Sequence, residues 1–296
     1  MSYWETGPWT HRKYTILRKY LEACEKFAGK YRNFAYSETH GGSGRIRLTS
    51  NGLEEDGSPL IAGRITPSFP CHIVEIDPGR FATLQTSING LSHVKAINGD
   101  CNVHIDLVLS QLYSWVFSFF FIDPNGLVYR SSAGEKHDQL TWQTMDKIAR
   151  HDKTEILLNF PLEALQRCGG YALNNPDTPT TNAYEEDISH FFGDSSWKQV
   201  GVDKRKLLDH YVKTRLRNHY KYIGAILIRS TNNNIPQYYL VYGSKNEIGG
   251  TIMRNIMKVE WVDMNGGAYP LTRPNFDTER KWLDAEFPLD YFVFEN

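Results

Sequence analysis

The chain has 296 residues, 41% of them hydrophobic, and a formal net charge of −1 at pH 7, which is typical of a globular protein with a real core. The near-zero charge excludes a protein-wide basic field for nucleic acid, so any such partner would need a local patch. The four cysteines form no CxxC pair, which excludes a zinc knuckle or a disulfide framework and favours free thiols in a reducing cytosol. The start of the chain does not resemble a signal peptide, and no apolar run could cross a membrane, so we expect a soluble cytoplasmic protein.

The first predicted element is an amphipathic helix over 9–31, in which apolar residues recur at helical spacing. A short strand over 33–38 follows and runs into closely spaced glycines. Segment 45–56 is polar and rich in turn residues, which favours an insertion or a lid, and Ser58 is expected to cap a small helix.

Strands and helices then alternate along the chain. The apolar pattern predicts strands over 72–77, 93–99, 115–123 and 154–160, separated by helices over 78–88, 103–113 and 138–150. Strands that alternate with helices are typical of βαβ units and of a parallel sheet.

The pattern changes in the last third of the chain. Residues 169–186 are expected to form a long loop, and 203–220 a helix rich in Lys, Arg and His. The strands predicted over 223–230 and 238–244 are so close in sequence that they must pair as an antiparallel hairpin. A helix over 245–258 and an aromatic tail complete the chain.

This order of elements predicts an α/β fold of the class I S-adenosylmethionine (SAM) methyltransferase type, which is Rossmann-like. Its doubly wound sheet ends in an antiparallel hairpin. We expect an N-terminal helical segment over 1–32 and the α/β domain over 33–258, with the loop and the basic helix of 169–220 inserted in it. A C-terminal extension over 259–296 would pack on the body, because it carries too many aromatic residues for disorder.

Four consecutive strand ends carry polar or glycine residues, and ligands of doubly wound sheets lie at the carboxyl ends of the strands. The four groups are Glu38 with Gly41, Gly42 and Gly44; Glu75; Asp100 with Cys101; and Asp123 with Asn125.

SAM is the cofactor that this order favours. Glycines let the first loop pass close to the methionine part and the ribose, and Glu75 offers two acceptor oxygens to the ribose hydroxyls. A polar group after the third strand, at Asp100, can bond the adenine amino group. The fourth strand end would face the sulfonium methyl, where Asp123 and Asn125 orient the acceptor or take its proton.

Each of these positions also has an ordinary explanation. The glycines could form a surface turn, Asp77 and Asp100 could cap the helices that follow them, and 123–126 is a good turn sequence by itself. The order of the four groups at consecutive strand ends is what favours a site.

The motifs resemble the three-Cys-motif partner protein (TcmP) family over most of the chain. The segments that carry the resemblance are WTHRKYTILRKYL, YSETHGGSGR, DGSPLIAG, VEIDPGRF, INGDCN, FFFIDPNG, LLNFP and YYLVYGSKNEIGG. The resemblance implies a methyltransferase-like fold, SAM as cofactor, and a partner protein with a cysteine motif that is similar to radical-SAM enzymes.

A local basic patch is predicted on and just after the helix over 203–220, and its members are Lys213, Arg215, Arg217 and Lys221. The interleaved Tyr211, Tyr220 and Tyr222 could stack on bases, which would make this a nucleic-acid-binding surface. The alternative is a solvated helix face whose tyrosines pack on the sheet.

The leading hypothesis is therefore a SAM-dependent methyltransferase whose acceptor is nucleic acid. The alternative is a non-methylating partner protein of the same fold that binds a nucleotide, nucleic acid or a neighbouring radical-SAM-like enzyme. The feature that distinguishes these two hypotheses is the polar first loop, with Thr39, His40 and Ser43. No histidine has metal-ligand spacing, so no metal is predicted.

Overall fold

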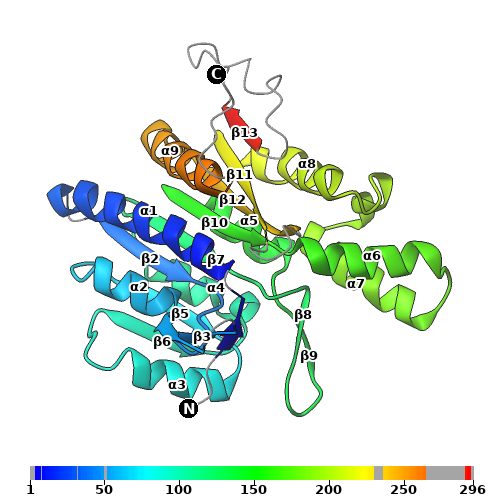
Figure 1. The fold of residues 1–296 in the computed structure, drawn as a ribbon, viewed down its shortest axis with the longest axis horizontal. Helices are drawn as coiled ribbons and strands as arrows, with labels where there is room; N and C mark the ends of the chain where they lie inside the picture. Colours follow the sequence, from blue (N-terminus) through cyan, green and yellow to red (C-terminus); the bar gives the residue numbers. More distant parts are fainter. Residues whose placement is uncertain are drawn as a thin grey trace.

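A computed structural model describes residues 4–7, 9–31, 33–49, 52–229, 236–264 and 291–294 (Figure 1). Within these residues the main sheet has the strand order β13-β11-β12-β10-β7-β2-β5-β6. Its strands are β2 (Phe34–Glu38), β5 (Cys71–Glu75), β6 (Val94–Asn98), β7 (Phe117–Ile122), β10 (Thr154–Phe160), β11 (Tyr222–Arg229), β12 (Pro236–Ser244) and β13 (Tyr291–Phe294).

Strands β2, β5, β6, β7 and β10 are parallel to one another, and β12 runs antiparallel to both β10 and β11. This is a doubly wound sheet that ends in an antiparallel hairpin, so the predicted class I methyltransferase-like fold is confirmed. The strand β13 adds to β11 at the edge, whereas residues 265–290 of the predicted C-terminal extension lie outside the described residues.

Helices cover both faces of the sheet. They are α1 (Thr10–Tyr31), α2 (Ser58–Ile65), α3 (Pro78–Ser87), α4 (Cys101–Ser110), α5 (Trp142–Arg150), α6 (Leu162–Asn174), α7 (Pro179–Phe192), α8 (Lys204–Thr214) and α9 (Glu247–Met264). Two short 3₁₀ helices, η1 (Ser195–Gln199) and η2 (Leu216–Asn218), flank α8. Figure 1 shows α1 beside α9, and the two helices are in contact.

The central strands are buried on both faces, which explains why their sequences are continuously apolar. In β7, Phe119 and Phe121 pack with α1, α2 and α9, whereas Phe120 and Ile122 pack with α4 to α8. All four side chains are fully buried. Successive residues of one strand therefore supply the two halves of the core.

Two parts of the chain differ from the prediction. The prediction of a long loop over 169–186 is wrong, because α6 extends to Asn174 and α7 begins at Pro179. Thr178 caps α7 by accepting a hydrogen bond from the backbone N–H of Thr181, and the proline stands at the first helical position, where no N–H is needed.

The polar segment 45–56 also has regular structure. It forms β3 (Arg45–Leu48) and β4 (Glu54–Asp56), which build a small sheet with β1 (Trp4–Thr6). A second small hairpin, β8 (Val128–Arg130) with β9 (Lys136–Asp138), extends away from the body in Figure 1. No helix in the described part of the chain combines the length and the apolarity that crossing a membrane would require.

A buried carboxyl group joins α1 to the sheet. Glu155 of β10 accepts hydrogen bonds from the hydroxyls of Tyr20 in α1 and of Tyr242 and Ser244 in β12, the last two at 2.6 Å. Burial raises the pKa of Glu155 to about 7, against an ordinary value of 4.5, although the three hydroxyls oppose this shift.

This raised pKa predicts a pH-dependent stability. Between pH 4.5 and about 7 the folded protein holds a proton on Glu155 that the unfolded chain releases, so the free energy of unfolding falls as pH rises through this window. The substitution Glu155→Gln removes the titrating group and therefore this loss. The free energy of unfolding of the variant minus that of the wild type should be about 3 kcal/mol larger at pH 8 than at pH 4.5.

Urea denaturation across this pH range measures the difference. Glu22→Gln, at an exposed position of helix α1, is the matched control and should leave the pH dependence unchanged. If the free energy of unfolding changed with pH in the same way for wild type and Glu155→Gln, the prediction would be contradicted.

Candidate functional site

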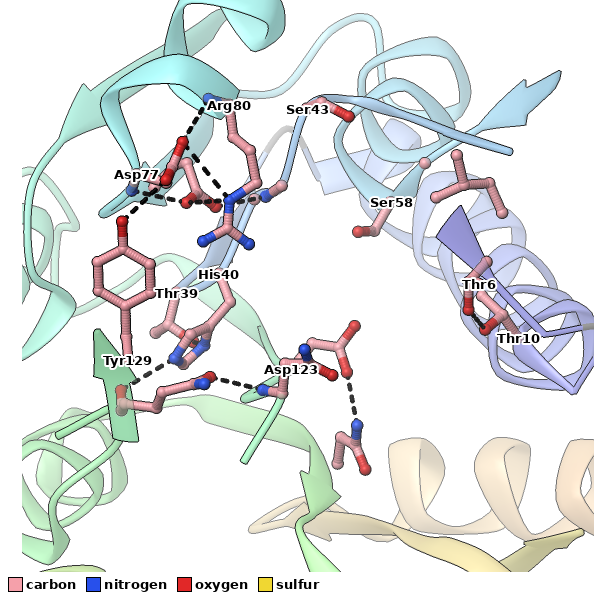
Figure 2. Close-up of a pocket in the computed structure, with 18 of the residues that line it drawn as sticks. Thr6, Thr10, Thr39, His40, Ser43, Ser58, Asp77, Arg80, Asp123 and Tyr129 are labelled. Carbon is pink, nitrogen blue, oxygen red and sulfur yellow. Dashed lines mark hydrogen bonds and ion pairs between the residues drawn. The ribbon is translucent and has the colours of Figure 1, made fainter. Parts of the chain in front are cut away.

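A cavity of about 900 Å³ opens at the carboxyl ends of the parallel strands (Figure 2). It is lined by eight of the nine residues that the sequence assigns to cofactor binding and catalysis: Gly41, Gly42, Gly44, Glu75, Asp100, Cys101, Asp123 and Asn125. The side chains that were expected to converge from four strand ends therefore do lie around one space. Its volume falls in the range that is usual for pockets that hold small molecules and cofactors.

The glycine loop after β2 is pressed against β5. The backbone N–H of Gly41 donates to the carbonyl of Val74 at 2.8 Å, and a Cβ at Gly41 would collide with the side chain of Ile73. Gly42 has φ +61°, in the left-handed region that favours glycine, and its N–H donates to Glu75 Oε2 at 2.7 Å. The close approach of two strand ends is thus the physical reason for these glycines.

Glu75 ends β5 with its carboxyl group at the cavity wall. The oxygen Oε1 accepts the backbone N–H of Asp77 at 2.8 Å and lies 3.2 Å from the Nε of Arg80. Burial raises the pKa of Glu75, and the guanidinium of Arg80 opposes the shift. Each oxygen keeps acceptor capacity beyond these bonds.

Asp77 caps α3, as its ordinary explanation predicted, by accepting the N–H of Arg80 at 2.7 Å. It also accepts a hydrogen bond from the hydroxyl of Tyr129 in β8 at 2.8 Å, and Figure 2 shows this side chain reaching across to it. The guanidinium of Arg80 lies 5.6 Å from the centre of the Tyr129 ring. The hairpin β8–β9 is thereby tied to the end of β5.

Glu38 is the one assigned residue that does not line the cavity. It is buried in β2, where it accepts hydrogen bonds from Tyr36 Oη at 3.0 Å and Ser58 Oγ at 2.5 Å. Burial raises its pKa to about 8, against the opposing effect of the two hydroxyls. Glu38 therefore lies beneath the cavity, and the Ser58 hydroxyl that it holds is at the wall; that hydroxyl does not cap α2, whose N-cap is Gly57.

Asp100 and Cys101 begin α4 at the third strand end. Asp100 caps this helix through the N–H of Asn102 at 2.7 Å, and its other oxygen lies 3.7 Å from Nδ1 of His137 in β9. The buried thiol of Cys101 donates to the carbonyl of Gln139 at 3.2 Å, and burial raises the pKa of this thiol. Cys101 is thus a packed wall residue.

His40 connects the glycine loop to the segment after β9. Its Nε2 lies 2.9 Å from the carbonyl of Gln139, which can only accept, so Nε2 carries the proton. Nδ1 then accepts from the hydroxyl of Thr39 at 2.7 Å. Burial lowers the pKa of His40, which favours this neutral form.

The fourth strand end holds an ion pair that the sequence interpretation missed. Asp123 Oδ2 lies 2.5 Å from Nζ of Lys13 in α1, and Asp123 Oδ1 accepts from Nδ2 of Asn159 at 2.8 Å. Asn125 lies at the exposed rim, where its N–H donates to the side chain of Gln139 at 2.5 Å. Lys13 could have been found, because it continues the apolar stripe of Ile16, Leu17 and Tyr20 at helical spacing.

The basic patch does not belong to this cavity. Strand β11 runs parallel to β10, so the residues just before Tyr222, which include Arg217 and Lys221, lie at the amino-end edge of the sheet, opposite to Asp123. Lys213 and Lys221 are exposed, whereas Arg217 is half-buried.

The structure contradicts the proposed stacking of bases on the tyrosines of this patch. Tyr211, Tyr220 and Tyr222 are all buried. Arg215 is 16% exposed and lies 2.5 Å from Asp194; it also donates to the carbonyl of Phe192 and packs on the ring of Trp142. The packed tyrosines agree with the alternative interpretation.

No protein-family model and no curated protein matches this sequence. Among similar solved structures, one is a protein of Legionella pneumophila str. Philadelphia 1, with 11% identity and a TM-score of 0.49 over 86% of this chain and 94% of that one. Another is an O-methyltransferase from Bacillus cereus in complex with SAH, with 12% identity and a TM-score of 0.42 over 77% and 80% of the chains. A third is the fibrillarin pre-rRNA processing protein of Methanococcus jannaschii, with 10% identity and a TM-score of 0.41 over 73% and 68%.

All three TM-scores are below 0.5, so the fold assignment rests on the strand order and directions of the sheet. The resemblance to the TcmP family stays a prediction, as does the partner protein that it implies.

The contacts of Arg215 predict a structural effect. Arg215→Ala removes the hydrogen bond to the Phe192 carbonyl, the ion pair with Asp194 and the packing on Trp142, and should lower the free energy of unfolding by about 1–2 kcal/mol. Urea denaturation measures this loss. Lys213→Ala, at an exposed position of α8, is the control and should change the free energy of unfolding by less than about 0.5 kcal/mol. Equal losses of stability in the two variants would contradict the structural role of Arg215.

Proposed function

We propose that this protein is a SAM-dependent methyltransferase that acts in the cavity at the carboxyl ends of the strands. The observation that carries the proposal is the convergence of four consecutive strand ends on one cavity of about 900 Å³. The glycine loop after β2 and the carboxyl group of Glu75 at the end of β5 are joined by the hydrogen bond from the Gly42 N–H. Ligands of doubly wound sheets lie at this edge.

The residues present suit this cofactor. A Cβ at Gly42 would meet no protein atom within 4 Å, so the lack of a side chain there leaves room for the methionine part and the ribose beside the loop. Glu75 would accept the ribose hydroxyls, and Asp100 would accept the adenine amino group. When bound, SAM supplies an electrophilic methyl group on a sulfonium sulfur, and transfer to an acceptor lone pair leaves S-adenosylhomocysteine.

The task of the protein residues at the other end of the cavity is to orient the acceptor. Asp123 is fixed from two sides by Lys13 and Asn159, so its carboxylate has one defined direction. It can accept an N–H or O–H of the acceptor and receive the proton that the acceptor loses. Asn125 lies at the rim, where its side chain would meet the outer part of the acceptor.

A nucleic-acid acceptor is the finer part of the sequence hypothesis, and the basic patch gives it no support. Lys221 and Arg217 lie at the opposite edge of the sheet, and the tyrosines of the patch are buried. The proposal therefore leaves the basic helix out of the acceptor site.

Calorimetry with SAM tests the proposal. We expect the wild type to bind, and Glu75→Ala to weaken the binding at least tenfold, because a charged group that makes hydrogen bonds to the ribose contributes about 1.5–3 kcal/mol. Asp106→Ala, at an exposed site on α4 outside the cavity, is the control and should bind as the wild type does. Absence of heat with the wild type would reject the proposal and favour the non-methylating partner protein.

A further inference from the structure

Lys13 is a buried cation at the methyl-acceptor end of the cavity. Only 7% of the residue is exposed, although it stands on a helix near the start of the chain. Its Nζ lies 2.5 Å from Asp123 Oδ2, and the centres of the Tyr14, Phe121 and Tyr238 rings lie 5.4, 5.9 and 5.6 Å from it. Figure 2 shows Asp123, the partner of Lys13, at the edge of the open centre of the cavity.

Burial makes each of these two charges depend on the other. A charged group that is removed from water without a partner is strongly destabilised, whereas a paired and hydrogen-bonded group is tolerated. Asp123 supplies the counter-charge for Lys13, and the three rings supply cation–π contacts. The pair carries no net charge.

The docking of α1 fixes the position of Lys13. The neighbouring Arg12 and the more distant Lys19 both pair with Glu260 of α9, at 3.3 and 2.6 Å, and Glu260 is only 3% exposed. One and two turns further along α1, Ile16, Leu17 and Tyr20 are buried in the core. The ammonium of Lys13 is therefore held at Asp123 by a packed helix.

We propose that Lys13 is a positioning and specificity-determining residue of the transfer site, which neutralises Asp123 so that the cavity takes an uncharged acceptor. This inference rests on the proposed function. An unpaired Asp123 would attract protonated amines, whose nitrogen has no lone pair to accept a methyl group. An unpaired Lys13 would attract carboxylates and phosphates. The neutral pair, beside Tyr14, Tyr238 and Trp9 in the cavity wall, suits an uncharged planar group that donates an N–H or O–H to Asp123.

The inference can be tested without knowing the acceptor, by comparing two ligands that differ in charge. SAM carries a positive sulfonium, and S-adenosylhomocysteine lacks this charge. The ratio of their affinities, measured by calorimetry, therefore reports the charge that surrounds the transfer site. Sinefungin, which carries an ammonium at the same position, should follow SAM.

Opposite changes in this ratio are expected for the two members of the pair. Lys13→Met leaves the charge of Asp123 without its ammonium partner, so the ratio of the affinity for SAM to that for S-adenosylhomocysteine should rise about tenfold relative to wild type. Asp123→Asn leaves the ammonium without its carboxylate, so the same ratio should fall about tenfold. The double variant Lys13→Met with Asp123→Asn should return to the wild-type ratio, and Lys13→Arg should keep it. A pair that serves only the fold would give the same ratio in all variants, which would overturn the inference.

Two further outcomes are separable. If neither ligand binds to the wild type, the proposed function fails and this inference fails with it, whereas binding with unchanged ratios rejects the inference alone. If circular dichroism shows that Lys13→Met does not fold, the Asp123→Asn variant, which keeps the shape of the side chain, decides the matter. An unchanged ratio in that variant overturns the inference.

Discussion

The pairing of β2 between β5 and β7 is the constraint on which the site depends. All three strands are parallel, so their carboxyl ends meet at one edge, and the loops after them must share the space beyond it. Glu38 is still inside the sheet, opposite Ile73 and Phe121, and the chain leaves the sheet only at the following residues. This register explains why the glycine loop lines the cavity while Glu38 lies beneath it.

Local signals in the sequence were sufficient for the strands from β2 to β12 of the main sheet and for most of the strand-end residues, whereas the edge strand β13 was not predicted. Most of these strands are short apolar runs, and each polar group ends or closely follows a strand, so their convergence needs only the rule that parallel strands share an edge. The caps at Asp77 and Asp100 follow from equally local chemistry. The helices α6 and α7 were missed because the glycines, asparagines and prolines around 169–180 were interpreted as one loop, although Gly169 and Gly170 lie inside α6 and Pro179 begins α7.

The acceptor end could not be predicted in this way, because it is made by contacts between distant parts of the chain. Lys13 and Asp123 are 110 residues apart, and nothing near Asp123 in the sequence indicates a cation. What the sequence did contain was a lysine on the apolar face of a helix, which is a buried charge that requires a partner. The burial of Tyr211 and Tyr220 likewise depends on how α8 and η2 pack, which composition alone does not reveal.

Glu38 at the end of β2 and Asp123 just after β7 differ in the groups that contact their carboxyl groups. Glu38 is held by two hydroxyls, which do not offset its burial, so its pKa of about 8 keeps it mostly protonated at neutral pH. Asp123 is paired instead with the ammonium of Lys13, which supplies an opposite charge. With Glu38 neutral, the charge at this end of the cavity is set by Lys13 and Asp123 together. The N-terminal helix thus supplies the cation that balances the acid at the fourth strand end.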